Sequence, residues 1–242
     1  MGWYTHWFGT RYYTLLYGHR DDADAATWVD AILGRWQLPA RAHLLDMACG
    51  RGRHARHFAL RGMRTTGIDI SDASIADARV AAANVEFHVH DMREVFALGA
   101  FDGICCLFTS LGYFDHLADD QLVFHAAAKA LKPGGFFVLD FMNTEVVLRD
   151  LVGEEVVERD GVHFRIARCL VNDVLVKRVT VTDGAEVHLF EERVQALDPT
   201  TLESMARNAG LEILDRTDGP VLSPFDPQRS ARFVLWTRKP LA

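Results

Sequence analysis

The sequence predicts an α/β protein with a doubly wound, mostly parallel sheet of seven strands and an antiparallel meander inserted near its end. Three observations predict this class. Strand and helix patterns alternate over residues 41–150. Four strand patterns separated only by short turns follow over 151–196, and the alternation resumes over 197–242. The 242 residues, 49% of them hydrophobic, suffice for one large domain with an insert.

Residues 1–40 precede the alternating pattern and form the first expected part of the chain. Aromatic residues are concentrated in 1–20, namely Trp3, Tyr4, Trp7, Phe8, Tyr12, Tyr13 and Tyr17. A helix is expected over 22–37, because its apolar residues form one stripe at helical spacing. Pro39 ends this helix, since proline cannot donate the next backbone hydrogen bond.

The core is expected to consist of residues 41–150 and 197–242. Its predicted strands are 42–47, 65–70, 85–89, 101–108, 136–141, 211–215 and 232–237, and its predicted helices are 53–61, 71–83, 119–131 and 198–208. Helical crossovers between parallel strands are right-handed. The carboxyl ends of the parallel strands therefore meet along one crevice, where ligands bind in such folds.

The turn residues between the predicted strands define the insert over residues 151–196. Strands are expected at 154–158, 163–171, 174–182 and 186–196. Asp160-Gly161, Asn172-Asp173 and Asp183-Gly184 separate them. These pairs tolerate the positive φ of hairpin turns, so the four strands are predicted to form an antiparallel meander.

Composition excludes some classes of function. The formal net charge of -7 disfavours a nucleic-acid partner held by bulk electrostatics. No run approaches the roughly 18 to 20 apolar residues of a membrane span, and the N-terminus lacks a secretory pattern. The four cysteines form no Cys-x-x-Cys pair, so neither a metal site nor a redox pair is expected. A cytoplasmic protein with reduced thiols is the expectation.

A glycine-rich turn follows the first core strand. Gly50-x-Gly52-x-x-Ala55 lies between that strand and a helix. Missing side chains let a ligand approach the backbone, and the N–H groups of the helix N-terminus face it. Taken alone, this turn fits several nucleotide-containing cofactors.

Three acidic residues at successive strand ends narrow the choice. Asp46 would repel a pyrophosphate and favour a cationic amino group, and Asp69 is placed to accept hydrogen bonds from ribose hydroxyls. Asp91 beside Met92 suits an adenine ring, with a polar contact at its edge and an apolar one on its face. Asp91 as a helix N-cap and Asp69 as a turn residue are the alternatives for single positions.

Four segments together resemble the class I S-adenosylmethionine (SAM)-dependent methyltransferases. They are Leu44–Gly52, similar to the family's SAM-binding loop, Gly67–Ser71, similar to its ribose segment, His90–Met92, similar to its adenine segment, and Leu131–Gly135, a family landmark. Ala48 departs from the pattern, where glycine is more frequent. Leu107–Ser110 stands where methyltransferases of exocyclic base amines carry Asn-Pro-Pro-Tyr or Asp-Pro-Pro-Tyr, which argues against that substrate class.

The resemblance implies a Rossmann-like core, SAM as cofactor and S-adenosylhomocysteine as product. It implies cofactor-binding positions at Tyr13, Asp46, Ala48, Cys49, Gly50, Gly52, Arg53, Asp69, Ile70, Asp91, Met92 and Phe108. The insert and the aromatic N-terminus are similar to the cap and lid of small-molecule, glycine N-methyltransferase-like members. Tyr13 then corresponds to a tyrosine near the methionine end of SAM, and residues 1–20 and the insert are expected to close over the site.

No catalytic residue is fixed by the sequence. Tyr113 and His116 are the candidates, with Asp115, His163 and His188 as further groups that could take or position a proton. The expected reaction is direct in-line methyl transfer to a small molecule, in a monomer or homodimer. The alternatives are a methyltransferase of RNA or protein, a nucleotide-dependent oxidoreductase, or a non-catalytic SAM-binding module.

An arginine-rich stretch would support the RNA alternative. Its members are Arg51, Arg53, Arg56, Arg61 and Arg64. Because the chain is acidic overall, we expect these residues to form the solvated face of a helix instead, with Arg53 near the cofactor.

Overall fold

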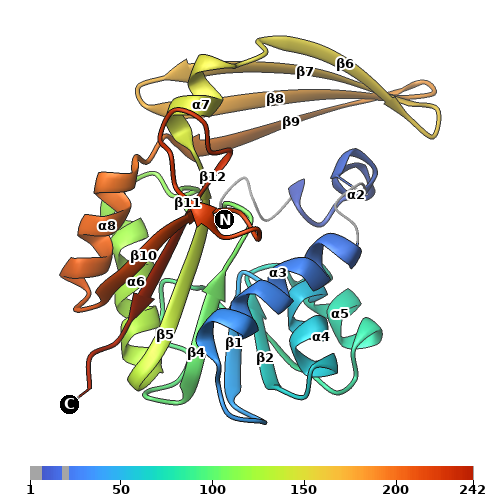
Figure 1. Ribbon diagram of the computed structural model, residues 1–242. Coiled ribbons are helices and arrows are strands. Elements are labelled where there is room, and N and C mark those ends of the chain that lie inside the picture. The colour runs from blue at the N-terminus through green and yellow to red at the C-terminus, as the bar shows by residue number, and fades with distance from the viewer. Residues whose placement is uncertain (1–6, 18–21, 242) are drawn as a thin grey trace.

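The computed structural model of the protein describes residues 7–17 and 22–241. It contains a large mixed sheet with helices on both faces and a separate four-stranded antiparallel sheet above it (Figure 1). Trp3, Tyr4 and the rest of residues 1–6 and 18–21 of the expected lid lie outside the described residues. No helix within the described ranges is long and apolar enough to span a bilayer.

The large sheet contains the seven predicted strands and a two-residue addition, β11. Its strands are β1 (His43–Met47), β2 (Arg64–Asp69), β3 (Glu86–Val89), β4 (Phe101–Cys106), β5 (Leu131–Met142), β10 (Glu212–Asp218), β11 (Ser223–Pro224) and β12 (Arg232–Arg238). Their order is β11-β10-β12-β5-β4-β1-β2-β3. Strands β1 to β5 pair in parallel, and β12 pairs antiparallel with β5. The doubly wound prediction is confirmed.

Helices cover both faces of this sheet (Figure 1). The helices are α2 (Arg11–Tyr17), α3 (Asp22–Trp36), α4 (Arg53–Leu60), α5 (Asp72–Ala81), α6 (Leu117–Ala130), α7 (Thr144–Arg149) and α8 (Pro199–Asn208). On one face, α6 and α8 bury Phe124 and Leu202 against the strands. On the other, α3 and α4 bury Trp28 and Phe58. The sequence did not predict α2 or α7, because two turns or fewer are too short to show a helical period.

The antiparallel sheet is the predicted meander. Its strands β6 (Glu154–Arg159), β7 (Val162–Val171), β8 (Val174–Asp183) and β9 (Glu186–Gln195) are paired in sequence order. Asp160 and Gly161 take φ of 50° and 77°, and Asn172 and Asp173 take 49° and 59°. These positive values explain why Asn, Asp and Gly occupy the turns.

The N-terminal segment packs on the antiparallel sheet. Trp7, Tyr12 and Leu16 share a hydrophobic cluster with Phe164 and Val179 of β7 and β8. Figure 1 shows α2 directly beneath this sheet and above α3. Two regions far apart in the sequence therefore form one unit over the carboxyl ends of the parallel strands.

Candidate functional site

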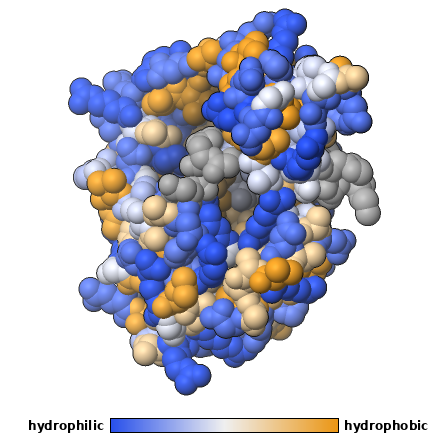
Figure 2. All heavy atoms as spheres, turned by 90° about the vertical axis from the view of Figure 1, so that its right-hand side faces the viewer, coloured by the Kyte–Doolittle hydropathy of each residue, from blue (hydrophilic) through white to orange (hydrophobic). Residues whose placement is uncertain are grey.

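A cavity of about 630 Å³ lies between the two sheets. Its lower lining comes from the ends of β1, β2 and β4 and the loops that follow, and its upper lining comes from α2, β8 and β9. Figure 2 shows this face of the molecule, which is hollowed between the antiparallel sheet at the top and the large sheet domain below. The cavity is large enough for a nucleoside-containing cofactor and a small second ligand.

The glycine-rich turn brings backbone to the cavity. Gly50 lines it with φ 55°, and no atom lies within 4 Å of the position a Cβ would occupy. Gly52 does not line the cavity. Its φ is 75°, and a Cβ there would lie 2.4 Å from the ring of Phe87, so packing requires this glycine. Ala48 also takes a left-handed φ, 57°, which explains why glycine is favoured there and costs an alanine about 1 to 2 kcal/mol.

Asp46 is a buried carboxylate at the end of β1, and Asp69 is a half-buried carboxylate at the end of β2. Asp46 accepts a hydrogen bond from the N–H of Ala55 in α4 at 3.0 Å, and burial raises its pKa to about 7. Asp69 accepts hydrogen bonds from the N–H groups of Gly50 at 2.8 Å and Ser71 at 2.9 Å. Burial also raises the pKa of Asp69, although these N–H groups oppose the shift. Both carboxylates line the cavity, where a cationic or hydrogen-donating ligand would stabilise them.

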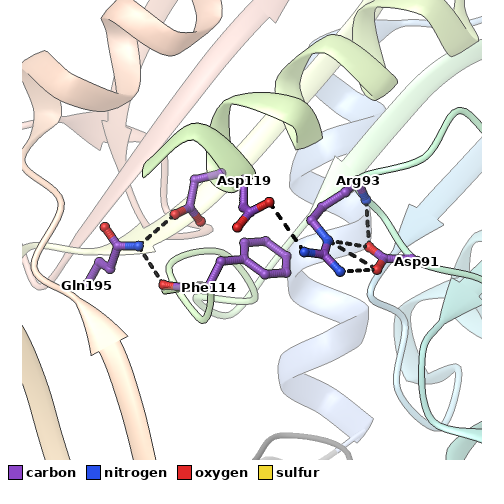
Figure 3. A network of polar contacts seen from close by, with 6 residues as sticks. Asp91, Arg93, Phe114, Asp119 and Gln195 are labelled. Atoms are coloured by element: carbon purple, nitrogen blue, oxygen red, sulfur yellow. Dashed lines mark hydrogen bonds and ion pairs between the residues drawn. The ribbon is translucent and has the colours of Figure 1, made fainter. Parts of the chain in front are cut away.

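Asp91 lines the cavity and is part of an ion-pair network (Figure 3). Arg93 donates to both carboxylate oxygens of Asp91, at 2.6 Å from Nη2, and lies 3.4 Å from Asp119. Burial alone would raise the pKa of Asp91, but the side-chain and backbone N–H groups of Arg93 outweigh it and lower the pKa. No helix begins after Asp91, so the N-cap alternative is wrong.

The same network reaches the antiparallel sheet. The guanidinium of Arg93 lies 4.7 Å from the centre of the Phe114 ring. The backbone carbonyl of Phe114 accepts a hydrogen bond from Gln195 of β9 at 2.6 Å (Figure 3). Gln195 also donates to the buried Asp120, whose pKa burial raises to about 7. The loop that carries Asp91 and the insert are thereby connected through a few contacts.

Most of the other expected positions also line the cavity. They are Tyr13, Cys49, Arg53, Ile70, Met92, Phe108 and Tyr113. Arg53 lies over the ring of Phe108 at 5.0 Å, and its guanidinium is 3.9 Å from Asp24. His116 is exposed, precedes α6, and is not part of the lining, because the chain leaves the cavity after Phe114.

The two histidines of the insert do not face the cavity either. His163 is exposed and lies 3.2 Å from Glu158 of the neighbouring strand. His188 lies 3.2 Å from Glu186, with its ring 5.0 Å from that of Tyr12. Strand alternation turns His163 to the outer face of β7, opposite Phe164. His188 shares a strand face with Glu192, but it lies farther along β9 beside Tyr12 and outside the lining.

Carboxylates surround the arginine-rich stretch. The pairs are Arg51 with Asp77, Arg53 with Asp24, Arg56 with Asp22, Arg61 with Asp30 and Arg64 with Glu86. The arginines lie on the surface around α4 as expected, and the structure adds that each is paired with a carboxylate. This arrangement weakens the case for an RNA-binding patch, since each cation already has a protein partner.

Sequence reasoning missed several residues of the cavity. His54 lines it from the start of α4, and burial lowers its pKa to about 3, so this imidazole is neutral. The sequence could have indicated that His54 lines the cavity, because His54 directly follows Arg53, which was expected near the cofactor. Glu192, Val194 and Leu175 come from the insert and carried no motif. The alternation of β9 did hold one signal, because Glu192 falls on the same strand face as two apolar residues.

Arg232 of β12 is a further residue of the lining. Its guanidinium donates to both oxygens of Asp140, at 2.7 and 2.8 Å, and to the hydroxyl of Thr109 at 3.0 Å. Asp140 is completely buried and also accepts the N–H of Phe108 at 2.8 Å. This bidentate pair fixes the loop after β4, which carries Phe108 and Ser110 into the cavity.

Comparison with known proteins agrees with this geometry. Residues 44–135 match the family model described as "Methyltransferase domain". A dTDP-3-amino-3,4,6-trideoxy-α-D-glucopyranose N,N-dimethyltransferase of Streptomyces venezuelae is 34% identical over 152 residues, which are 62% of this chain and 64% of that protein. A dTDP-3-amino-3,6-dideoxy-α-D-glucopyranose N,N-dimethyltransferase of Streptomyces fradiae is 34% identical over 50% of this chain and 46% of that protein. The chain thus spans about half to two thirds of the length of these relatives.

Solved structures show the same architecture over nearly the whole chain. An S-adenosylmethionine-dependent methyltransferase from Clostridium acetobutylicum ATCC 824 superposes with a TM-score of 0.81 and 20% identity, over 95% of this chain and 96% of that one. A sugar N-methyltransferase from Streptoalloteichus sp ATCC 53650 gives a TM-score of 0.72 and 25% identity, over 95% and 93%. The shared architecture is the Rossmann-like fold of methyltransferases. Residues 44–135 are therefore similar in sequence to a methyltransferase domain, and the chain as a whole has the fold of the S-adenosylmethionine-dependent methyltransferase named above.

Proposed function

We propose that this protein transfers the methyl group of SAM to a small-molecule acceptor by direct in-line displacement and releases S-adenosylhomocysteine. The observation that carries the proposal is the cavity at the carboxyl ends of the parallel strands, where Asp46, Asp69 and Asp91 meet Gly50. A buried and a half-buried carboxylate beside open backbone suit a ligand that carries both a cation and a diol.

The residues of the lower lining fit the parts of this cofactor. Asp46 would face the methionine ammonium, and Asp69 would accept hydrogen bonds from the ribose hydroxyls. Asp91 and Met92 would contact the adenine edge and face. The remaining positions, which are Tyr13, Ala48, Cys49, Arg53, Ile70 and Phe108, would enclose the methionine and ribose portions. Gly52 supports the turn by its packing on Phe87.

Little acid–base chemistry is required of the protein. The bound cofactor supplies a methyl group already activated by its positively charged sulfur. The chain has to align the acceptor with that methyl group and exclude water, and such alignment can supply on the order of 7 to 11 kcal/mol. Tyr113 lines the cavity and is our candidate for orienting the acceptor.

We also propose that the N-terminal part, residues 1–40, and the insert, residues 151–196, form the lid and cap that select the acceptor. Phe8, Tyr13 and Tyr17 line the cavity from below the antiparallel sheet, and Leu175 and Val194 line it from that sheet. The relatives named above act on dTDP-linked amino sugars, and a ubiquinone biosynthesis O-methyltransferase of Xanthomonas axonopodis is 26% identical over 65% of its length. Amino sugars and phenols are therefore the first acceptors to test.

Calorimetric titration with S-adenosylhomocysteine, with NADH as control, tests the proposal. Micromolar one-to-one binding of S-adenosylhomocysteine alone is the expected result. Labelled SAM would then be used to screen dTDP-amino sugars, simple amines and phenols. Preference for NADH, or no binding of S-adenosylhomocysteine, would refute the proposal. The cytoplasmic location and the monomeric or homodimeric state stay predictions.

A further inference from the structure

Glu192 is a carboxylate on the apolar face of the antiparallel sheet. Strand alternation places it on the same face of β9 as Phe190 and Val194. Its partner directly across the sheet is Lys177 of β8. The side chains of Glu192 and Lys177 are only 15% and 12% exposed. Burying two charges on an apolar face is costly, so packing alone does not explain them.

The carboxylate of Glu192 is held through one oxygen. Oε1 accepts hydrogen bonds from Nε1 of Trp7 at 2.6 Å and from the hydroxyl of Tyr17 at 2.8 Å. Nζ of Lys177 lies 3.8 Å from the same oxygen and donates to the hydroxyl of Tyr17. No residue in the described part of the chain donates to Oε2. One oxygen therefore fixes the orientation of the group, and the other is left for a ligand.

Glu192 lines the cavity, and Lys177 does not. The cavity therefore meets the carboxylate of this ion pair but not its ammonium group. Around it, Tyr13, Tyr17 and Tyr113 contribute aromatic rings to the lining. Aromatic faces and a carboxylate both favour a positively charged partner.

We propose that Glu192 accepts, through Oε2, a hydrogen bond from the nitrogen of an amine acceptor, so that the substrates of this site are amines. This inference rests on the proposed methyl transfer. During transfer, the neutral amine nitrogen forms a bond to the methyl carbon while the methyl–sulfur bond breaks and its electron pair stays on sulfur. The positive charge moves from sulfur to nitrogen, and the extra proton on the product nitrogen leaves to water. A carboxylate beside the nitrogen stabilises the charge that develops there.

Sinefungin tests this proposal without knowledge of the natural acceptor. In this SAM analogue a carbon bearing an amino group replaces the methylated sulfur, so its amine occupies the position of the transferred methyl group, next to that of the acceptor nitrogen. Calorimetry would compare sinefungin and S-adenosylhomocysteine binding to wild-type protein, Glu192→Gln and Glu192→Asp. The matched control is Glu191→Gln, the neighbouring residue whose carboxylate pairs with Arg178 and Arg193 on the other strand face.

We expect Glu192→Gln to weaken sinefungin about tenfold while S-adenosylhomocysteine affinity stays within twofold, because only sinefungin carries the extra amine. Glu192→Asp, which keeps the charge, should retain most of the sinefungin affinity, and Glu191→Gln should match wild type. Retained S-adenosylhomocysteine binding also shows that the variant is folded.

Three outcomes would contradict the proposal. Equal sinefungin affinity in Glu192→Gln and wild type would show that Glu192 does not contact the amine. An equal loss of S-adenosylhomocysteine affinity would place Glu192 at the cofactor's own ammonium group. Turnover of a phenol or alcohol in preference to the amine of the same skeleton would contradict the substrate class. Failure of wild-type protein to bind S-adenosylhomocysteine would instead refute the proposed function itself.

Discussion

The lower and upper halves of the cavity are built by different means. In the lower half, Asp46, Gly50 and Asp69 lie at consecutive strand ends within a short stretch of sequence. In the upper half, the hydroxyl of Tyr17 in α2 donates a hydrogen bond to Glu192 of β9, which lies 175 residues later in the sequence. Backbone N–H groups hold Asp46 and Asp69 in the lower half, whereas side chains from α2, β8 and β9 hold the upper half.

Under the proposed function, this difference would separate cofactor binding from acceptor selection. Backbone donors to Asp46 and Asp69 depend on the fold of the turn, so the side chains around them can vary without moving the carboxylates. Contacts such as Trp7 to Glu192 depend on particular side chains. We expect changes in the lower half to alter affinity for S-adenosylhomocysteine, and changes in the upper half to alter turnover.

Deleting residues 1–20 is the strongest test of this division. The deletion removes Phe8, Tyr13 and Tyr17 from the lining and Trp7 from the cluster beneath the antiparallel sheet. We expect turnover to fall by at least about 100-fold, because misplaced or solvated reactants lose the gain from alignment. Turnover of labelled SAM reports on the upper half of the cavity, and calorimetry with S-adenosylhomocysteine reports on the lower half. Unchanged turnover on the acceptor would show that this segment is no lid.

Asp69→Ala tests the lower half. Loss of a half-buried acceptor for ligand hydroxyl groups should weaken S-adenosylhomocysteine binding about 100-fold, from two lost hydrogen bonds to a charged group. Calorimetry measures the change. Asp72→Ala, at the exposed start of α5, is the matched control and should bind like wild type. If Asp69→Ala retained full affinity for S-adenosylhomocysteine, the carboxylate of Asp69 would only accept hydrogen bonds from the backbone of the turn and would not bind the ligand.

Asp46 gives the lower half a dependence on pH. Burial raises its pKa to about 7, and a bound ammonium group would favour the ionised form. Affinity for S-adenosylhomocysteine should therefore rise as the pH increases through about 7. Calorimetry near pH 8 should find Asp46→Asn about tenfold weaker than wild type, with the difference gone near pH 5.5. A constant ratio between the two proteins across this range would contradict the assignment.

Arg93→Ala tests the connection between the halves and has the smallest expected effect. Arg93 is about a third exposed, and such ion pairs contribute up to about 1 kcal/mol, so S-adenosylhomocysteine affinity should fall by no more than about fivefold. Arg149→Ala, which removes an exposed pair with Asp150, is the control. A loss as large as that of Asp69→Ala would mean that Asp91 depends on Arg93 to bind adenine.

Sequence reasoning found the lower half because its signals are local. A glycine-rich turn and the acids at Asp46, Asp69 and Asp91 are visible as patterns, and all three acids line the cavity. It misjudged Gly52, whose constraint is the ring of Phe87, because that contact joins different elements. It proposed His116, which the start of α6 leaves exposed.

By itself, the sequence determined the α/β class, the order of strands and helices, the antiparallel meander and the acidic strand ends that line the lower half of the cavity. These follow from periodicity, turn chemistry and strand ends, which act over a few residues. Only the tertiary structure decided that α2 packs under β7 and β8, and that Trp7, Tyr17 and Lys177 gather around Glu192. Such contacts depend on how separate elements pack together, and no local pattern encodes that arrangement.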